Sequence, residues 1–475
     1  MLSLALLLGA GSAVLSRGAS TDLLQARDPD VDPRRAIVAH LFDEALAGNS
    51  AYSKLQELCQ ATPHRLSGSS DAENAVSWAR DQMTHDGLDN VRLEPCTVPH
   101  WERGRIAVLE VTEPASARGT YLPILALGGS IATPREGLEA ELCTVQSFDQ
   151  LAALGDSARG KIVFYDRAMD PRTLDPFEAY GAAVDQRARG AVEAARHGAA
   201  GAIVRSLTLR LDDLPHTGSM RYEDGVERVP AAAVSTAGAE RLAALLHKEK
   251  RVAVRFRLDC RENPDVPSHN VVGEIRGQSR PDEIVLVGAH LDNWDVGQGA
   301  HDDGAGCAEV LEAMRLVRAL GLKPARTLRA VLFMNEENGL RGAHAYRDAH
   351  KAELARHVLA IETDRGGFSP RGFETSAQGE LLASLRSIAA MLEPAGAGFL
   401  RLGGGGADVS ALREDGVPVM ELLSDAQRYF DVHHCSRDTL DTVSPRELEL
   451  GAAVLAAMAF CAADASAGIA PPQPR

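Results

Sequence analysis

The chain has 475 residues, of which 45% are hydrophobic and 24% charged, and its formal net charge is −16. That length exceeds what a single hydrophobic core usually supports, so we expect two or three domains. The acidic balance and the absence of any basic run argue against nucleic acid as a partner, because binding phosphates requires clustered Lys and Arg side chains.

An apolar run occupies residues 2–15, and it is followed by Ser16, Arg17, Gly18, Ala19 and Ser20, most of which are small. The run is shorter than the roughly 20 apolar residues that cross a bilayer, and it resembles the hydrophobic part of a signal peptide. We therefore predict that residues 1–20 are an export signal, that the protein is secreted or periplasmic, and that it has no stable membrane insertion. Because no Lys or Arg precedes the run, two alternatives remain: a start upstream of Met1, or a segment that is not an export signal.

The first ordered part of the chain is predicted at residues 36–128, after a polar, flexible lead-in at residues 21–35. Helical periodicity covers residues 36–60 and 72–87, and Ser69 or Ser70 is a plausible cap of the second helix. Three strand-like runs follow, at residues 91–93, 106–111 and 121–127. We interpret this part as the N-terminal portion of the main domain.

The pattern changes between residues 129 and 256. Short strand-like runs alternate here with an Ala-rich helix at residues 182–197 and another helix at residues 237–247. No cluster of potential metal ligands occurs in this stretch. We therefore interpret it as a separate, inserted α/β module.

Residues 257–467 have the regular alternation of an α/β domain. Four continuous apolar runs, typical of buried parallel strands, alternate with helical segments, at residues 284–289, 327–334, 358–361 and 417–422. This alternation favours a mostly parallel sheet with helices on both faces. The predicted fold class is α/β, with a doubly wound mixed sheet flanked by helices and an inserted α/β domain. The Pro-rich residues 468–475 are predicted to be disordered.

Histidine and carboxylate side chains follow these predicted strands. The first strand leads to His290, Asp292, Asp302 and Asp303, the second to Glu336 and Glu337, the third to Glu362 and Asp364, and the fourth to His433 and His434. Taken singly, each pattern is more often a turn, a helix cap or a solvated pair. Taken together they gather at one sheet edge, where ligands bind in α/β folds.

Carboxylates crowded at one edge would repel one another unless cations compensate their charge. A mixture of imidazole and carboxylate ligands suits zinc better than magnesium, which prefers oxygen ligands. Two metal ions roughly 3.5–4 Å apart can share one carboxylate. Adjacent glutamates then have distinct uses, because one can bind metal while its neighbour handles protons.

Five segments of the sequence resemble the carboxypeptidase Q family, a branch of the co-catalytic zinc peptidases that is related to bacterial aminopeptidases. They are HLDNWDVGQG at residues 290–299, DDG at 302–304, EE at 336–337, ETD at 362–364 and HH at 433–434. The resemblance covers nearly the whole chain and includes RLSGS at 65–69, GKIV at 160–163 and PHTG at 215–218.

The resemblance implies two zinc ions per chain and five metal ligands. His290 and Asp364 would hold one ion, Glu337 and His434 would hold the other, and Asp302 would bridge both. Such a site activates a water molecule near neutral pH and stabilises the developing oxyanion.

Two further residues have implied catalytic roles. Glu336 would be the general base that takes a proton from the water and passes it to the leaving amine. Asp292 would orient His290 through a carboxylate–histidine contact. The inserted module resembles a protease-associated domain, which would shape or cover the cleft.

Three residues are candidates for binding substrate: Asp408, His433 and Arg437. Asp408 follows the glycine run 403–406, in a region where relatives contact substrate, although a plain flexible loop is the alternative. Arg437 adds a fixed positive charge next to the His433-His434 pair, so we expect it to attract a substrate carboxylate.

The predicted function is hydrolysis of short peptides, in particular dipeptides with free termini, by a zinc metallopeptidase. The resemblance also implies a homodimer. Two alternatives remain: a receptor on a catalytically dead scaffold of the same family, and a cyclising transferase with a single zinc ion. All five ligand positions and Glu336 are present, which disfavours the receptor.

Overall fold

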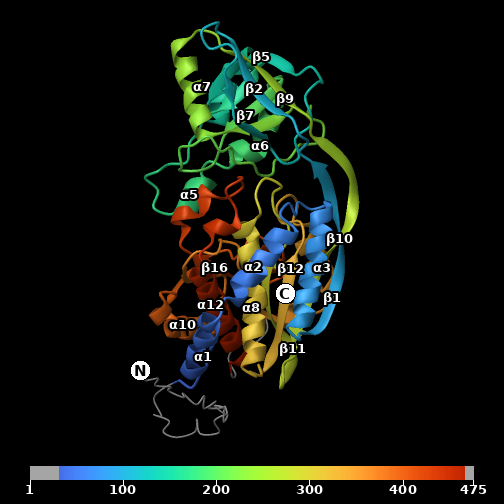
Figure 1. Cartoon of the computed structure of the whole chain (residues 1–475), viewed down its shortest axis with the longest axis vertical. Helices are drawn as coiled ribbons and strands as arrows, with labels where there is room; N and C mark the ends of the chain where they lie inside the picture. The colour runs from blue at the N-terminus through green and yellow to red at the C-terminus, as the bar shows by residue number, and fades with distance from the viewer. Residues whose placement is uncertain (1–31, 466–475) are drawn as a thin grey trace, which may run out of the picture.

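The computed structural model describes residues 32–465 and contains two lobes, each built around an eight-stranded sheet (Figure 1). The predicted export signal, most of the lead-in and the C-terminal tail lie outside the described residues. Within the described residues, no helix has the length and apolar character needed to span a membrane. The chain enters the lower lobe first, continues through the upper lobe and then returns to the lower one (Figure 1).

The sheet of the lower lobe confirms the predicted parallel core. Its strand order is β1-β10-β12-β11-β13-β16-β14-β15, and β12, β11, β13 and β16 run parallel to their neighbours in this core. These four strands agree with the four predicted runs to within a few residues at their ends, at Arg280–His290 (β11), Arg326–Phe333 (β12), His357–Glu362 (β13) and Val419–Ser424 (β16). Antiparallel pairing attaches the outer strands β10 (Arg261–Ile275) and β14 (Pro370–Thr375), and the sheet ends at β1 (Asp89–Glu102) and β15 (Phe399–Leu402). The fold is therefore α/β with a mixed sheet, as predicted.

Helices cover both faces of this sheet, because its central strands are apolar on both sides. In β11, Val285 and Val287 pack into one hydrophobic cluster, whereas Ile284 and Leu286 pack into another. Helices on the first face include α8 (Ala305–Ala319), α12 (Pro445–Asp464), α3 (Ser70–His85) and α10 (Gly379–Met391), and those on the second are α9 (Arg341–Ala349) and α11 (Ala407–Arg413). This arrangement leaves the carboxyl ends of the parallel strands free to carry a site.

The region predicted as one helix at residues 36–60 forms two helices, α1 (Arg34–Ala47) and α2 (Ser50–Ala61). Gly48 and Asn49 separate them, and Asn49 adopts a non-helical conformation before α2. Helix α1 also begins inside the segment predicted as lead-in. The cap of α3 is Ser69, whose hydroxyl accepts a hydrogen bond from the backbone N–H of Ala72 at 3.1 Å.

The upper lobe contains the second sheet, with the order β3-β2-β9-β5-β6-β7-β8-β4. Its strands are β2 (Ala107–Glu113), β3 (Tyr121–Leu122), β4 (Ile124–Ala126), β5 (Leu138–Val145), β6 (Ile162–Tyr165), β7 (Gly201–Arg205), β8 (Ala231–Val234) and β9 (Ala253–Leu258). The sheet therefore begins at Ala107, ahead of the predicted start of the inserted module at residue 129, because β2 pairs with β9 and β4 pairs with β8. Its helices are α4 (Phe148–Leu154), α5 (Pro176–Gly181), α6 (Asp185–Arg196) and α7 (Thr236–Lys248).

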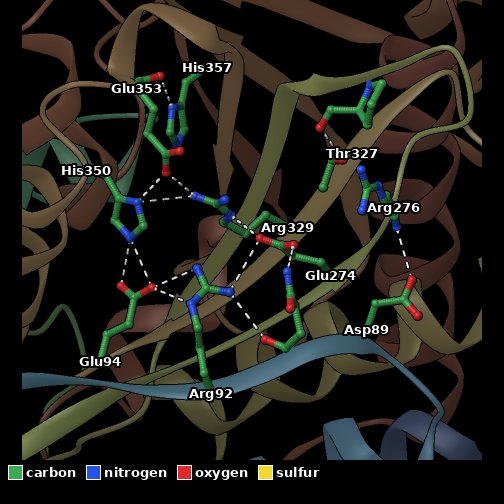
Figure 2. Close-up of polar contacts among 12 residues, drawn as sticks. Asp89, Arg92, Glu94, Glu274, Arg276, Thr327, Arg329, His350, Glu353 and His357 are labelled. Carbon is green, nitrogen blue, oxygen red and sulfur yellow. Dashed lines mark hydrogen bonds and ion pairs between the residues drawn. The ribbon is translucent and has the colours of Figure 1, made fainter.

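A network of hydrogen bonds and ion pairs connects β1, β10, β12 and the segment that follows α9 (Figure 2). Arg329 on β12 donates hydrogen bonds to Glu274 at 2.8 Å and to Glu353 at 3.0 Å. The ring of His350 lies between Glu353 and Glu94, and its Nε2 is 2.9 Å from a Glu94 oxygen. These contacts join the edge strand β1 to its neighbours in the lower sheet.

Candidate metal centre and substrate cleft

The strand ends bring the predicted ligands to one edge of the lower sheet. His290 is the last residue of β11, Glu337 follows β12, and Asp364 follows β13. Asp302 lies in the turn Ala300–Gly304 that leads into α8, and His434 follows the short 3-10 helix Ala426–Asp431. All of these side chains except that of Asp364 are buried.

Asp302 stands between the two histidines, with one carboxylate oxygen toward each. Its Oδ1 is 3.2 Å from Nε2 of His290, and its Oδ2 is 3.2 Å from Nε2 of His434. Asp364 lies 3.4 Å from the same nitrogen of His290, and Glu337 lies 3.1 Å from that of His434. The five side chains thus form two sets of three that share Asp302.

Several nitrogen and oxygen atoms of this cluster that could bind a metal ion are buried and have no hydrogen-bond partner among the described residues. They are Nε2 of His290, Oδ2 of Asp302, Oε1 of Glu337 and Oδ1 of Asp364. Buried polar atoms normally have partners, so these atoms call for an additional group between them. Two imidazoles and three carboxylates fit divalent cations of the zinc type.

The nearby carboxylates raise the pKa values of both histidines in the cluster. Burial opposes protonation of His434, but Glu337 and Asp302 outweigh it and raise the pKa of this imidazole to about 9. Burial likewise opposes a charged His290, and Asp364 and Asp302 raise its pKa well above the usual value. The carboxylates thus favour positive charge between these side chains, which a bound cation would supply.

His433 is a third imidazole beside the cluster. Its ring stacks on that of His434 with the ring centroids 3.5 Å apart, and its Nε2 lies 3.8 Å from Oδ2 of Asp302. Asp302, His433 and His434 are close enough for one ion to be held by all three. Burial and the neighbouring His434 lower the pKa of His433 well below its usual value, so this imidazole is neutral.

Asp292 supports the site in a different way from the predicted one. Its carboxylate lies 3.9 Å from Nδ1 of His290, whereas its backbone carbonyl lies at 3.0 Å from that nitrogen. The carboxylate Oδ1 instead accepts hydrogen bonds from the backbone N–H groups of Asn335 at 2.7 Å and Glu336 at 3.0 Å. Asp292 thus fixes the backbone of the Glu336-Glu337 pair as well as the ring of His290.

Asp438, to which the sequence assigned no role, holds the turn that carries Asp302. Its two oxygens accept hydrogen bonds from the backbone N–H groups of His301 at 2.7 Å and Asp302 at 3.1 Å. Burial and the nearby Asp302 raise its pKa to about 7. The neighbouring Asp303 caps the start of α8, since it accepts a hydrogen bond from the backbone N–H of Gly306 at 2.9 Å.

A cleft of about 340 Å³ opens onto the cluster, and both lobes line it. From the lower lobe come Asp302, Glu336, Glu337, Asp364, Tyr429, His433 and His434, and from the upper lobe come Phe177, Tyr180, Arg187, Ser219 and Arg221. Burial and the negative charges of Asp364 and Glu337 raise the pKa of Glu336 well above its usual value. A carboxyl group with a raised pKa that faces a cleft is suited to accept and return a proton.

The upper lobe contacts the backbone of His433 and His434 through His216 and Thr217. Nδ1 of His216 lies 2.6 Å from the backbone carbonyl of His433, and the backbone N–H of Thr217 donates to the carbonyl of His434 at 2.9 Å. The second lobe is therefore part of the framework of the site.

Of the three predicted substrate-binding residues, Asp408 and Arg437 lie outside the lining of the cleft. Asp408 is fully buried under the glycine run, next to Glu362, whose carboxylate accepts hydrogen bonds from the backbone N–H groups of Asp408 and Val409. Arg437 donates to Asp212 at 3.5 Å. His433 is the member of this predicted trio that lines the cleft.

Comparison with known proteins agrees with this geometry. Residues 270–459 match the model of peptidase family M28. The chain is 37% identical to carboxypeptidase Q of Bos taurus over 96% of this chain and 95% of that one. It superposes on the crystal structure of a peptidase M28 precursor from Shewanella amazonensis with a TM-score of 0.89 and 38% identity, covering 93% of this chain and 99% of that one.

A zinc aminopeptidase from Bacillus subtilis shares the fold at 20% identity, with a TM-score of 0.64 over 89% of this chain and 97% of that one. The relatives with higher identity cover almost the whole chain, including both lobes. The chain is therefore a peptidase, a member of family M28 that belongs to its carboxypeptidase Q group of metallopeptidases.

Proposed function

We propose that this chain is a dizinc metallopeptidase that hydrolyses short peptides, in particular dipeptides with free termini. The observation that carries the proposal is the position of Asp302, whose two oxygens face two different histidines at 3.2 Å each. A site for a single ion would not need a carboxylate whose two oxygens face two separate sets of ligands. Co-catalytic pairs of metal ions share a bridging carboxylate in this manner.

In this proposal His290 and Asp364 hold one zinc ion, Glu337 and His434 hold the other, and Asp302 contacts both. Bound zinc supplies an acidified water and a positive charge that polarises the scissile carbonyl. His433 lines the cleft and stacks on His434, so we assign it to the substrate-binding surface and not to the ligands.

Glu336 acts as the general base. It lines the cleft beside the ligands, and its neighbour Glu337 keeps its own carboxylate against His434. The raised pKa of Glu336 supports a carboxyl that accepts a proton from the attacking water and delivers it to the leaving amine. Asp292 fixes the backbone of Glu336 and so keeps that carboxylate at the cleft.

We further propose that the upper lobe is a protease-associated-like domain that closes one side of the cleft. Its residues Tyr180 and Arg187 in the lining support this role. Export by residues 1–20 is also proposed, from the apolar run at residues 2–15, and assembly as a homodimer is proposed from the resemblance. Secretion of the full-length chain and light scattering of the purified protein test these two proposals directly.

The test of the catalytic proposal is a panel of dipeptides incubated with the purified zinc-loaded protein, with Glu336→Gln in parallel. Removal of a general base should slow turnover roughly 10²–10⁴-fold. Chelation should abolish turnover, and the variant should keep its metal because Glu336 is not a ligand. A protein that binds dipeptides without turnover would indicate a receptor, and one with a single tightly bound zinc and no peptidase activity would indicate the cyclising transferase.

A further inference from the structure

Residues 335–340, the base loop, follow β12 and carry the proposed general base. The loop begins at Asn335 and ends at Leu340, and both residues have a left-handed backbone, with φ values of 72° and 55°. The backbone N–H of Leu340 donates to the carbonyl of Asn335 at 2.6 Å and so closes the loop. Glu336 and Glu337 lie inside it, so the shape of the base loop decides where their carboxylates point.

Asn335 holds the base loop through its side chain. It is fully buried, and asparagine adopts a left-handed backbone more readily than most residues that carry a side chain. Its Nδ2 donates to the hydroxyl of Ser67 at 2.6 Å and to the side-chain oxygen of Asn338. Its Oδ1 accepts a hydrogen bond from the backbone N–H of Arg341 at 3.3 Å. The packing here is close, because a Cβ atom built at Gly339 would lie 2.4 Å from that same oxygen.

Ser67 belongs to the segment RLSGS at residues 65–69, which is far from the base loop in the sequence. Its side chain is buried, and its hydroxyl donates to Oδ1 of Asn338 at 2.8 Å while it accepts from Asn335. The hydroxyl therefore uses its donor and an acceptor within the base loop. Asn335 and Asn338 flank the two glutamates of the loop, so Ser67 is bonded to the chain on both sides of them.

We infer that Ser67 is a positioning residue for the proposed general base Glu336, a role that rests on the proposed peptidase function. Without the hydroxyl, Asn335 and Asn338 would each lose a buried partner, and the base loop would shift to replace it. A general base has to lie within hydrogen-bond reach of the proton that it takes. A misplacement of about 1 Å can cost roughly 100-fold in rate, so a contact outside the cleft is able to control turnover.

The first test compares kcat and KM for alanylleucine in the zinc-saturated protein. Ser67→Ala should lower kcat roughly 10–100-fold, because the base is displaced in the step that it catalyses. KM should stay within about twofold of the native value, because the described residues that line the cleft do not include Ser67. An unchanged kcat, or a loss that appears only in KM, would overturn the inference.

The matched control is Ser69→Ala in the same segment. The hydroxyl of Ser69 accepts from the backbone N–H of Ala72 at 3.1 Å, which caps α3, and it donates to the carbonyl of His64. Its removal should lower the midpoint of thermal unfolding, because a helix cap is lost, and should leave kcat unchanged. If Ser69→Ala lost as much kcat as Ser67→Ala, any disturbance of the segment would impair turnover and Ser67 would have no special role.

A double-mutant cycle with Glu336→Gln shows whether Ser67 acts through the base. Once the carboxylate of Glu336 is removed, Ser67→Ala should cost no more than about twofold further in kcat. An equal loss in both backgrounds would assign Ser67 to the fold as a whole and contradict the inference.

Asn335→Gly tests the same contact from its other side. Glycine adopts the left-handed backbone without strain, but it has no amide for Ser67 to hold. The variant should reproduce the kcat loss of Ser67→Ala, and combining the two should add little, because they remove one shared contact. Full activity in Asn335→Gly would show that the backbone angle alone shapes the base loop, which is incompatible with the role inferred for Ser67.

Hydrogen exchange separates this inference from the catalytic proposal, because it needs no turnover. In Ser67→Ala, the backbone amide of Leu340 that closes the base loop should exchange roughly tenfold faster, whereas in Ser69→Ala it should exchange at the native rate. If the native protein hydrolysed no dipeptide while this exchange still accelerated, the peptidase proposal would fail and the hold of Ser67 on the base loop would stand. Exchange at the native rate in Ser67→Ala would refute that hold.

Discussion

The carboxylate of Asp292 accepts a hydrogen bond from the backbone N–H of Glu336 at 3.0 Å, and this contact joins the ends of β11 and β12. The same residue turns its backbone carbonyl toward Nδ1 of His290 at 3.0 Å. One residue therefore orients a proposed metal ligand through its main chain and the proposed general base through its side chain. The two functions can be separated by mutation.

Asp292→Asn keeps an oxygen that can accept the two backbone hydrogen bonds, whereas Asp292→Ala removes it. Neither substitution changes the carbonyl that contacts His290. Outer contacts of this kind typically contribute 10–100-fold, so we expect the alanine variant to lose roughly 100-fold in kcat/KM and the asparagine variant to lose about tenfold or less. Steady-state kinetics on one dipeptide checks this. If the asparagine variant were as inactive as the alanine variant, the negative charge and not the acceptor geometry would be what Asp292 contributes.

Arg65 is a fully buried arginine that holds the loop between His290 and Asp302. Its side chain donates to the carbonyls of Leu291 at 2.9 Å, Gln298 at 2.8 Å and Gly299 at 3.1 Å. A lysine has one nitrogen and cannot reach all of these oxygens.

We therefore expect Arg65→Lys to lose both stability and zinc affinity. Each hydrogen bond lost from a charged donor costs roughly 1.5–3 kcal/mol, so the free energy of unfolding should fall by at least about 3 kcal/mol. Chemical unfolding and zinc titration measure the two effects. The control is Arg80→Lys, because Arg80 is an exposed residue of α3 that pairs with Asp81. Wild-type stability in Arg65→Lys would show that the loop is held by other contacts.

His433 and His434 are adjacent imidazoles, and either could contact an ion together with Asp302. The distance to Asp302 is 3.2 Å for His434 and 3.8 Å for His433, which supports the ligand role proposed for His434. We expect His434→Gln to lose one of the two zinc ions and His433→Gln to retain both while raising KM. Zinc counting by mass spectrometry under native conditions distinguishes the two variants, and the opposite pattern would reassign the ligand.

His357 makes the free energy of unfolding depend on pH, and this effect does not involve the proposed metal site. Burial, assisted by the charge of Arg329 (Figure 2), lowers its pKa to about 4. Its ring lies 2.9 Å from the hydroxyl of Tyr346 and 3.2 Å from the carbonyl of Glu353. The unfolded chain takes up this proton near pH 6.5, so between about pH 6.5 and pH 4 the unfolded state binds more protons and stability falls as the pH falls.

The slope from one such group is at most about 1.4 kcal/mol per pH unit. His357→Gln should lose this slope, because a glutamine side chain does not titrate in this pH range. The substitution should preserve the fold, because the amide can still donate to the carbonyl of Glu353 and accept from the hydroxyl of Tyr346. His216 and His301 also have pKa values near 4, but they titrate alike in both proteins and cancel in the difference. Urea unfolding at several pH values gives the two curves, and parallel curves would contradict the assignment.

The sequence predicted the lower lobe well, because its strands are continuous apolar runs and its ligands follow them directly. His290 and Glu337 could be placed at one sheet edge from strand ends alone. The start of the upper sheet could not be placed, since β2 and β4 pair with strands that come more than a hundred residues later. Such long-range pairing leaves no local mark in the sequence.

Arg187 escaped the sequence analysis for a different reason. It lies in an Ala-rich helix that carries no ligand motif, and the side chains around it, Tyr180 and His434, come from both lobes. A signal was nevertheless present, because Arg187, Gly190, Ala191 and Ala194 share one face of α6 and are buried there. An arginine at a position of a small-residue face is unusual, and it indicates a functional contact when no acidic partner lies on that face.

The central claim is that two metal ions share Asp302, and counting zinc tests it most directly. Native mass spectrometry of the zinc-reconstituted protein should give about two ions per chain, as a co-catalytic site requires, and fewer than two in Asp302→Ala. A wild-type protein with one ion or none, or an Asp302→Ala variant that retains two, would contradict the shared site.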